Sequence, residues 1–348
     1  MNYNYLGNSE IKISSLCLGT MTFGEQNNEL ESFRIMDYAS DLGINFLDTA
    51  EIYSAPINKK SYGVTEQIIG KWLKTQRRDK VVIGTKIAGP HNKKAFSWIP
   101  RKSSKYNEEN ITQAVNDSLK RLKTDYIDLY QLHTPIRETN FFGRLGYIHS
   151  ASNNTERFEE VLHIFQKIIK QGKIRSLGIS NETPWGLTQY LETSKIKNLP
   201  KVVSIQNPYN LLNRTFEVGL AEVSIKEKCG LIGYSPLAFG YLTGKYRKKK
   251  FPKKSRMKLY FKYFNRYKTP NASKAIEEYY KISKKYKISL TNMAIKFCEM
   301  QQFSSSTIIG VTNTTQLEDN VNSLNTNLSK NLLSEIKKVQ KIFPNPCP

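Results

Sequence analysis

The sequence predicts an α/β protein that folds as a single closed (β/α)8 barrel, or TIM barrel, with an N-terminal β-hairpin and long loops at its C-terminal face. Three observations predict this fold. Eight short apolar runs recur along the chain, segments of helical periodicity separate them, and a length of 348 residues suits one barrel domain that occupies residues 1–348. The expected strands are residues 15–19, 44–49, 81–86, 127–133, 174–180, 202–207, 230–236 and 306–311.

The segments before and between these runs have their own signatures. Residues 3–5 and 11–13 form a short amphipathic opening that predicts the hairpin. Apolar residues between 111 and 122 make one helical stripe, and those between 158 and 169 make a clearer one with i, i+3, i+4, i+7 spacing. Gly172 follows the second stripe and is expected to end that helix.

The rival architecture is a doubly wound parallel sheet. That fold would bring a glycine-rich turn after the first strand to hold a pyrophosphate. Residues 16–24 do not supply the G-x-G-x-x-G pattern. The closed barrel is therefore the predicted fold.

Composition indicates a globular, soluble protein of the cytoplasm. Hydrophobic residues make up 39% of the chain, which is sufficient for a substantial core. No apolar run approaches the roughly 18 to 20 residues that a transmembrane helix needs, and residues 1–5 lack the features of a secretory signal. The four cysteines are widely spaced and have no neighbouring histidine cluster, so we expect reduced thiols and no metal site.

The net charge of +23 raises the alternative of a nucleic-acid or membrane-surface protein. Most lysines are scattered singly, however, and no nucleic-acid motif accompanies them. Two denser basic blocks lie at residues 247–262 and 284–287. We expect the second block to be a solvated helix face, and we predict neither nucleic-acid binding nor membrane insertion.

Polar side chains end three successive expected strands. Asp48, Lys86 and His133 each follow an apolar run, and Tyr53 lies five residues after Asp48. Sites on this fold lie at the C-terminal ends of the strands. We therefore expect these four side chains to meet at one mouth of the barrel as catalytic residues.

These four residue types together suit the reduction of a carbonyl group with hydride from a nicotinamide. The phenol of Tyr53 has an ordinary pKa of about 10, and an ammonium from Lys86 within about 4 to 6 Å is expected to lower it by roughly 1 to 3 units. Asp48 would hold Lys86 charged, and a neutral His133 would donate a hydrogen bond to the carbonyl oxygen. The alternative role of Lys86 as a Schiff-base nucleophile has no evident need for Tyr53 near Asp48.

Several motifs resemble the aldo-keto reductase superfamily. They are residues 18–24 (LGTMTFG), 48–53 (DTAEIY), 62–66 (YGVTE), 178–181 (GISN), 206–209 (QNPY) and 234–237 (YSPL). Residues 118–126, 207–214 and 216–223 are most similar to the bacterial Tas-type reductases, which are relatives of the β-subunits of voltage-gated potassium channels. The resemblance covers almost the whole chain. It implies a catalytic tetrad of Asp48, Tyr53, Lys86 and His133 in the roles given above.

The resemblance also implies that the cofactor is NADPH, bound in an extended form without a Rossmann fingerprint. Tyr234 or Tyr209 would support the nicotinamide ring, and Lys245 and Arg256 would contact the 2′-phosphate, which suits a point charge beside a forked guanidinium. The expected contacts are Gly19, Thr20, Met21, Asp48, Ser180, Asn181, Gln206, Tyr234, Ser235, Pro236, Leu237, Gly240, Lys245, Arg256, Gly310, Thr312, Gln316, Asp319 and Asn320.

Two further patterns lie near the expected phosphates. Residues 240–246 superficially suggest a P-loop, but they are one residue short between the glycines and have Tyr246 where Ser or Thr is needed. Thr315 and Glu318 have the spacing of a capping box, so we expect a helix to begin near Thr315 and to present amide donors to phosphate.

The loops at residues 87–106 and 134–155 are expected to shape the substrate pocket. They carry the aromatic residues Trp98, Phe141, Phe142 and Tyr147, which line the pocket or pack the loops. The predicted function is NADPH-dependent reduction of small aldehydes or ketones to alcohols, with Tyr53 as general acid. The alternative is an NADPH-binding redox sensor or channel-β-like regulatory module that turns over slowly. A homo-oligomer is left open.

Overall fold

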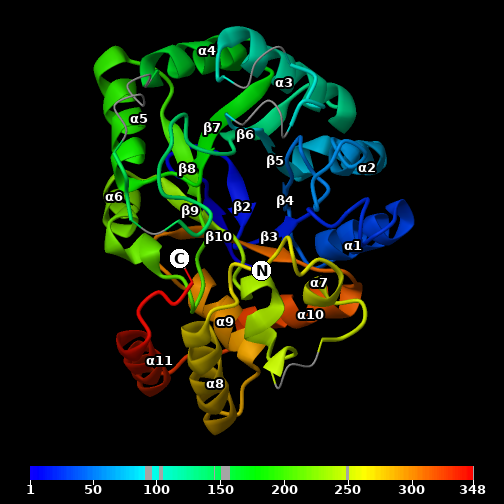
Figure 1. The fold of residues 1–348 in the computed structure, drawn as a ribbon. Helices are drawn as coiled ribbons and strands as arrows, with labels where there is room; N and C mark the ends of the chain where they lie inside the picture. Colours follow the sequence, from blue (N-terminus) through cyan, green and yellow to red (C-terminus); the bar gives the residue numbers. More distant parts are fainter. Residues whose placement is uncertain (91–95, 102–104, 145, 150–156, 248–250, 348) are drawn as a thin grey trace.

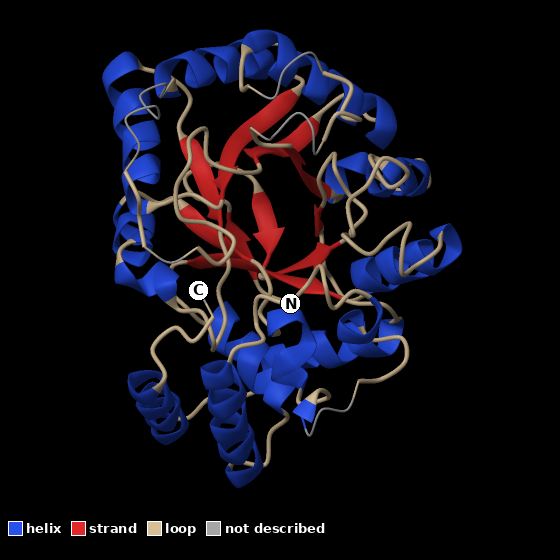
Figure 2. Ribbon diagram, in the orientation of Figure 1, coloured by secondary structure: helices blue, strands red, loops and turns tan. Residues whose placement is uncertain are grey.

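The computed structural model describes residues 1–90, 96–101, 105–144, 146–149, 157–247 and 251–347. Eight parallel strands close into a barrel in the order β10-β3-β4-β5-β6-β7-β8-β9, and helices surround it (Figure 1, Figure 2). The predicted (β/α)8 barrel is confirmed. The barrel strands are β3 (Leu16–Gly19), β4 (Phe46–Asp48), β5 (Val82–Ile87), β6 (Ile127–Leu132), β7 (Ile174–Ser180), β8 (Val202–Gln206), β9 (Gly230–Gly233) and β10 (Ser304–Gly310).

An antiparallel hairpin precedes the barrel, as predicted. Its apolar residues Leu6, Ile11 and Ile13 are buried in one cluster with barrel residues, including Phe46 and Val82, which open β4 and β5. Burial of this apolar surface closes the N-terminal end of the barrel. The opposite end, where the strands finish, is left for a site. The hairpin strands are β1 (Tyr3–Tyr5) and β2 (Lys12–Ser14).

The helices turn their apolar stripes toward the barrel. In α4, for example, Val161, Leu162 and Phe165 are fully buried, and Gly172 just beyond the helix has a φ of +71°, which suits its predicted role as terminator. The helices are α1 (Glu29–Asp41), α2 (Val64–Leu73), α3 (Glu108–Leu122), α4 (Phe158–Lys170), α5 (Pro184–Lys197), α6 (Leu220–Lys226), α7 (Arg256–Leu259), α8 (Pro270–Lys285), α9 (Leu290–Glu299), α10 (Thr314–Asn322) and α11 (Lys330–Ile342), with short 3-10 turns at Arg78–Lys80, Thr215–Val218, Ala238–Thr243 and Ser323–Asn325.

Two strands are each three residues shorter than predicted, for different reasons. β4 starts after Asn45, whose side chain is engaged with the hairpin, donating to the carbonyl oxygen of Lys12 at 2.9 Å and accepting from the amide of Ser14 at 2.8 Å. β9 ends before Tyr234, and Ser235 then has a φ of +59°, which leaves the extended region. The chain therefore bends sharply where it reaches the C-terminal mouth.

Long connections follow β6 and β9 at the C-terminal face. The connection from β9 to α8 contains the 3-10 turn Ala238–Thr243 and the short helix α7 (Figure 1). Arg247 of the first basic block pairs with Glu277 of α8 at 2.7 Å, Lys258 and Lys262 are exposed, and residues 248–250 of the block lie outside the described residues. Residues 91–95, 102–104, 145 and 150–156 of the two predicted substrate loops also lie outside them.

The remaining features of the fold agree with simple chemistry. All four cysteines are buried free thiols, as predicted. Lys284, Lys285 and Lys287 are exposed at the end of α8, also as predicted. Across the described ranges, no helix combines the length and apolar character that crossing a membrane requires.

Candidate active site

Asp48, Lys86 and His133 meet at the C-terminal mouth because β4, β5 and β6 are neighbouring parallel strands. The ammonium of Lys86 is fully buried and lies 2.8 Å from each carboxylate oxygen of Asp48 and 2.7 Å from the carbonyl oxygen of Thr49. All three ammonium donors are thus engaged. The ion pair has a single fixed geometry.

Tyr53 lies beside this ion pair, on the loop after β4. Its ring centroid is 5.4 Å from the Lys86 ammonium nitrogen and 5.8 Å from the ring centroid of His133, which it meets edge-on. Burial raises the pKa of Tyr53 well above its usual value, and the charge of Asp48 raises it further. The predicted net lowering of this pKa is therefore wrong, because burial and the charge of Asp48 raise the pKa by more than the Lys86 ammonium lowers it. The phenol is held in its protonated form.

His133 is a neutral imidazole, as predicted. Burial, and then the charge of Lys86, lower the pKa of His133 to about 3. Its Nδ1 is buried and has no hydrogen-bond partner among the residues described. The ring therefore retains hydrogen-bonding capacity that the protein itself does not use.

A hydrogen-bond network extends from Asp48 to the ends of β7 and β8. Gln206 Nε2 donates to Asp48 Oδ1 at 2.8 Å, and Ser180 Oγ donates to the carbonyl oxygen of Gln206 at 2.8 Å. Asn181, in the left-handed region with a φ of +57°, accepts a hydrogen bond from Tyr234 Oη at 2.7 Å. Ser180, Asn181 and Gln206, three of the cofactor contacts that the resemblance implies, therefore lie together beside Asp48.

Of the two tyrosines considered for the nicotinamide ring, Tyr234 lines the cavity at this mouth. Tyr209 is buried away from it, with its ring 5.2 Å from that of Phe303 and its hydroxyl donating to Glu217 at 2.5 Å. This geometry favours Tyr234.

A cavity of about 1210 Å³ opens over the tetrad and reaches the start of α10. Tyr53, His133 and Asp48 line it, whereas Lys86 is buried against Asp48 and does not form part of the cavity wall. All the residues that the resemblance implies for the cofactor line it as well: Gly19, Thr20, Met21, Asp48, Ser180, Asn181, Gln206, Tyr234, Ser235, Pro236, Leu237, Gly240, Lys245, Arg256, Gly310, Thr312, Gln316, Asp319 and Asn320.

Two cations of the β9–α8 connection meet in this cavity. Lys245 and Arg256 both line it, and neither pairs with a carboxylate within the part of the chain that the structure describes. Burial lowers the pKa of Arg256, and burial followed by the charge of Arg256 lowers the pKa of Lys245. Two neighbouring, uncompensated cations fit a phosphate group, and this end of the cavity therefore fits a phosphate-bearing cofactor.

Helix α10 closes the same end of the cavity and begins close to the predicted position. Its N-cap is Asn313, which has an extended backbone with a φ of −160° and accepts a hydrogen bond from the amide of Gln316 at 2.9 Å. Thr315 lies inside the first turn, so the predicted capping box of Thr315 with Glu318 is wrong. The chain changes from extended to helical at Asn313, and only a side chain at that point reaches the free amides.

A buried carboxylate that the sequence analysis did not single out holds the loop after β5. Glu51, within the 48–53 motif, accepts two hydrogen bonds from the guanidinium of Arg101, at 2.6 and 2.7 Å, and one from the amide of Ala88 at 2.6 Å. The pair connects this loop to the segment that carries Tyr53. The sequence signal for this role of Glu51 was its position two residues before Tyr53.

The four aromatic residues singled out in the two substrate loops have three different placements. Phe142 lines the cavity, and Phe141 packs edge-on against it with centroids 5.1 Å apart. Trp98 packs edge-on against Tyr62 at 5.6 Å and is absent from the cavity wall. Tyr147 is exposed on the loop surface.

Tyr263 and Arg266 also line the cavity, although the sequence analysis did not predict them. Their signal was weak. Arg266 is one of two arginines in a lysine-rich stretch, residues 251–268, and the other is Arg256.

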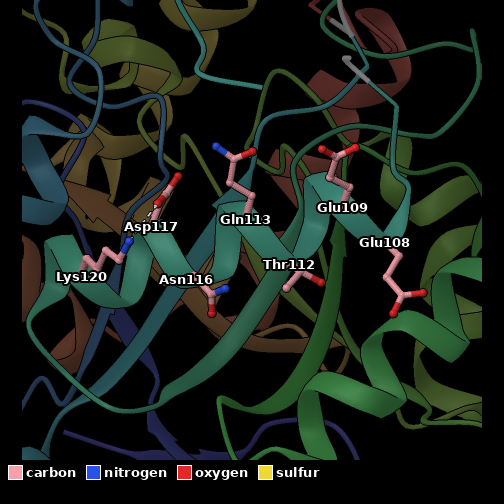
Figure 3. A pocket seen from close by; sticks show the side chains of 7 residues that line it. All are labelled: Glu108, Glu109, Thr112, Gln113, Asn116, Asp117 and Lys120. Atoms are coloured by element: carbon pink, nitrogen blue, oxygen red, sulfur yellow. Dashed lines mark ion pairs between the residues drawn. The ribbon is translucent and has the colours of Figure 1, made fainter. Parts of the chain in front are cut away.

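A second hollow, of about 480 Å³, lies on the outer side of α3 and has a different character (Figure 3). The side chains that line it stand on successive turns of one helix and point in different directions in Figure 3. Glu108 is paired with Lys167 of α4 at 2.8 Å, and Asp117 lies 3.9 Å from Lys120. No set of groups converges there, so the cavity at the barrel mouth is the candidate active site.

Comparison with known proteins agrees with this geometry. Residues 15–341 match the model of the aldo/keto reductase family. The chain is 42% identical to Protein tas of Escherichia coli over the full length of both chains, and 31% identical to the uncharacterized oxidoreductase YrpG of Bacillus subtilis over 99% of this chain and 97% of that protein. It is also 29% identical to a probable voltage-gated potassium channel subunit beta of Arabidopsis thaliana, over 92% of this chain and 90% of that protein.

Proposed function

Because the chain belongs to the aldo/keto reductase family, we propose that it is an NADPH-dependent oxidoreductase that reduces small aldehydes and ketones to alcohols, with Tyr53 as the general acid. The observation that carries this proposal is the grouping of Tyr53, the Lys86–Asp48 ion pair and a neutral His133 at one mouth of the barrel. Bound NADPH would supply a hydride to the carbonyl carbon.

Tyr53 then supplies the proton that completes the alcohol. Its raised pKa keeps the phenol protonated until negative charge develops on the carbonyl oxygen, and the alkoxide that forms is a much stronger base than a tyrosinate. The resulting tyrosinate lies near the ammonium of Lys86, which stabilises it. Asp48 keeps that ammonium in place through its two hydrogen bonds.

His133 orients the carbonyl oxygen toward Tyr53. A neutral imidazole donates one hydrogen bond without giving up a proton, and the low pKa of His133 keeps it neutral across the physiological range. The reaction would add a hydride to carbon and a proton to oxygen, after which the alcohol would leave and Tyr53 would regain a proton from solvent.

The residues of the cavity support NADPH as the cofactor. Ser180, Asn181 and Gln206 would hold the carboxamide beside Asp48, and Tyr234 would support the nicotinamide ring. Lys245 and Arg256 would hold the 2′-phosphate, since both are cations without an acid partner among the described residues.

The test is to follow NADPH consumption by the purified protein with a panel of small aldehydes. Tyr53→Phe removes one hydroxyl group and should lower kcat by about 10²- to 10⁴-fold, the usual contribution of a general acid. NADPH binding, measured by fluorescence titration, should remain. Equal turnover by the wild type and the variant would overturn the role of Tyr53.

A second candidate function has one observation in its favour. A relative with 29% identity is a probable voltage-gated potassium channel subunit beta, so an NADPH-binding redox sensor or regulatory module with weak turnover is the alternative. Tight binding of NADPH without turnover across a broad aldehyde panel would support that alternative over the reductase.

A further inference from the structure

Most partly buried arginines in the part of the chain that the structure describes pair with an acidic side chain, and two do not. Among the residues described, eight arginines are partly buried, and six of them pair with an Asp or Glu side chain. These pairs are Arg78–Asp128 at 2.7 Å, Arg101–Glu51 at 2.6 Å, Arg121–Glu66 at 2.6 Å, Arg137–Glu182 at 2.9 Å, Arg214–Glu217 at 2.6 Å and Arg247–Glu277 at 2.7 Å.

The two exceptions, Arg256 and Arg266, both line the cavity at the barrel mouth. A partly buried cation without a counter-charge is unfavourable, and the cost is removed when an anion binds beside it. Arg256 stands beside Lys245, where a phosphate of the cofactor is proposed to bind. That leaves Arg266 without an anionic partner among the residues that the structure describes.

Contacts place Arg266 at the carbonyl end of the cavity. Its Nη1 lies 3.4 Å from Tyr234 Oη, and that hydroxyl donates to Asn181 Oδ1 at 2.7 Å. Asn181 Nδ2 in turn donates to the carbonyl oxygen of His133 at 2.8 Å. A chain of three hydrogen bonds therefore connects the guanidinium of Arg266 to the backbone of His133 at the end of β6.

The neighbours of Arg266 within the described ranges are neutral groups. The guanidinium carbon lies 5.3 Å from the ring centroid of Phe142, which is on the loop that follows His133, and Nη1 donates a hydrogen bond to the hydroxyl of Tyr234. The hydroxyl of Tyr267 is a further neutral neighbour. A guanidinium presents a planar fork that matches the two oxygens of a carboxylate. One such fork among neutral groups suits a singly charged carboxylate, whereas the paired cations at the other end suit a phosphate.

We propose that Arg266 binds a carboxylate on the substrate, so that the preferred substrates are carbonyl compounds that also carry a carboxylate group. This inference rests on the proposed reductase function and names its substrate class. Arg266 is then a residue that determines specificity, while Tyr53 and His133 act at the carbonyl.

The experiment compares two aldehydes that differ in charge and by one methyl group. Para-carboxybenzaldehyde and its methyl ester have the same carbonyl group, and we expect the wild type to prefer the acid in kcat/KM by about 10-fold or more. Arg266→Gln should lower the acid-to-ester ratio by about 10- to 100-fold, chiefly through the KM of the acid, and leave the ester little changed. Arg266→Lys keeps the charge without the fork and should fall between the two.

Lys268→Gln is the matched control, because Lys268 is an exposed cation two residues away and the substitution changes the net charge equally. Its acid-to-ester ratio should equal that of the wild type. If Arg266→Gln lowers the rates for acid and ester equally, Arg266 only supports Tyr234 and the inference fails. An unchanged ratio in Arg266→Gln also overturns it.

A binding measurement separates this inference from the proposed function. Benzoate, which has the carboxylate but no reducible carbonyl, should bind the NADPH-loaded wild type at least about 10-fold more tightly than NADPH-loaded Arg266→Gln in calorimetry. Benzoate binding that depends on Arg266 without turnover of either aldehyde would keep the carboxylate site and reject the reductase. Turnover of both aldehydes with benzoate binding independent of Arg266 would keep the reductase and reject the site.

Discussion

The two parts of the cavity wall differ in how their charges are balanced. At the strand ends, Lys86 and Asp48 neutralise each other and every ammonium donor is engaged. On the connection between β9 and α8, Lys245, Arg256 and Arg266 have no acid partner among the described residues. The strand-end part is complete by itself and preorganised for chemistry, whereas the connection is electrostatically complete only when anionic ligands bind.

The largest effect is expected from a substitution that breaks the ion pair of the strand-end part. Lys86→Met removes the ammonium and leaves the buried carboxylate of Asp48 without a counter-charge, which should destabilise the protein by about 3–5 kcal/mol and lower kcat by about 10²-fold or more. Urea unfolding and steady-state kinetics measure the two losses. The control is Lys71→Met, because Lys71 and Glu29 form an exposed pair that should contribute no more than about 1 kcal/mol. Equal destabilisation by both variants would refute the comparison.

The next largest effect is expected from a cation on the connection between β9 and α8. Arg256→Ala should weaken NADPH binding by about 10- to 100-fold, or roughly 1.4–2.7 kcal/mol, and change NADH binding little, because only NADPH carries the 2′-phosphate. Titration of both cofactors by fluorescence measures the difference. Lys258→Ala, an exposed cation on the same short helix, should affect neither cofactor. Equal losses of NADPH and NADH in Arg256→Ala would reject the phosphate assignment.

The same division separates what the sequence could predict from what it could not. Asp48, Lys86 and His133 end apolar runs, and parallel strands in one barrel bring such ends to one mouth, so their meeting followed from pattern alone. The direction of the pKa shift of Tyr53 did not follow, because it depends on burial and on the distance to the charge of Asp48. Spacing along the chain contains neither quantity.

Loop residues were predictable only where the resemblance supplied a motif. Lys245 and Arg256 were expected on that basis, and both line the cavity. Arg266 has no periodicity or motif that distinguishes it from the lysines around it, and only the three-dimensional structure shows that it has no acid partner in the described part of the chain. Similarly, the choice of Asn313 over Thr315 as N-cap depends on where the backbone leaves the extended region.

A third prediction uses pH to sharpen the strand-end part. The pKa of His133 is about 3 in the folded protein, and its ordinary value in the unfolded chain is about 6.5, so between these values the unfolded state binds the proton more tightly. The contribution of His133 to the free energy of unfolding is therefore fully present well above about pH 6.5, and it decreases as the pH falls, by about 2 kcal/mol at pH 5.

The measurement is urea unfolding of wild type and His133→Gln at pH 7 and pH 5. His133→Gln should lose about 2 kcal/mol less than the wild type between the two values. His163→Gln serves as control, since His163 is exposed on α4 and should behave as the wild type does. Parallel losses in the wild type and His133→Gln would show that His133 is not held neutral by the fold.

The smallest effect tests how the phosphate end is built. Asn313→Ala removes the side chain that accepts the amide hydrogen bond of Gln316 at the start of α10, and it should cost about 1 kcal/mol of stability. Thr315→Ala changes a residue inside the first turn and should cost less than about 0.5 kcal/mol. Differences in urea midpoint at equal slope distinguish the two variants. If Thr315→Ala loses more stability than Asn313→Ala, Thr315 is the N-cap after all. The free amides at the start of α10 would then lie at a different position on the cavity wall from the one that Asn313 defines.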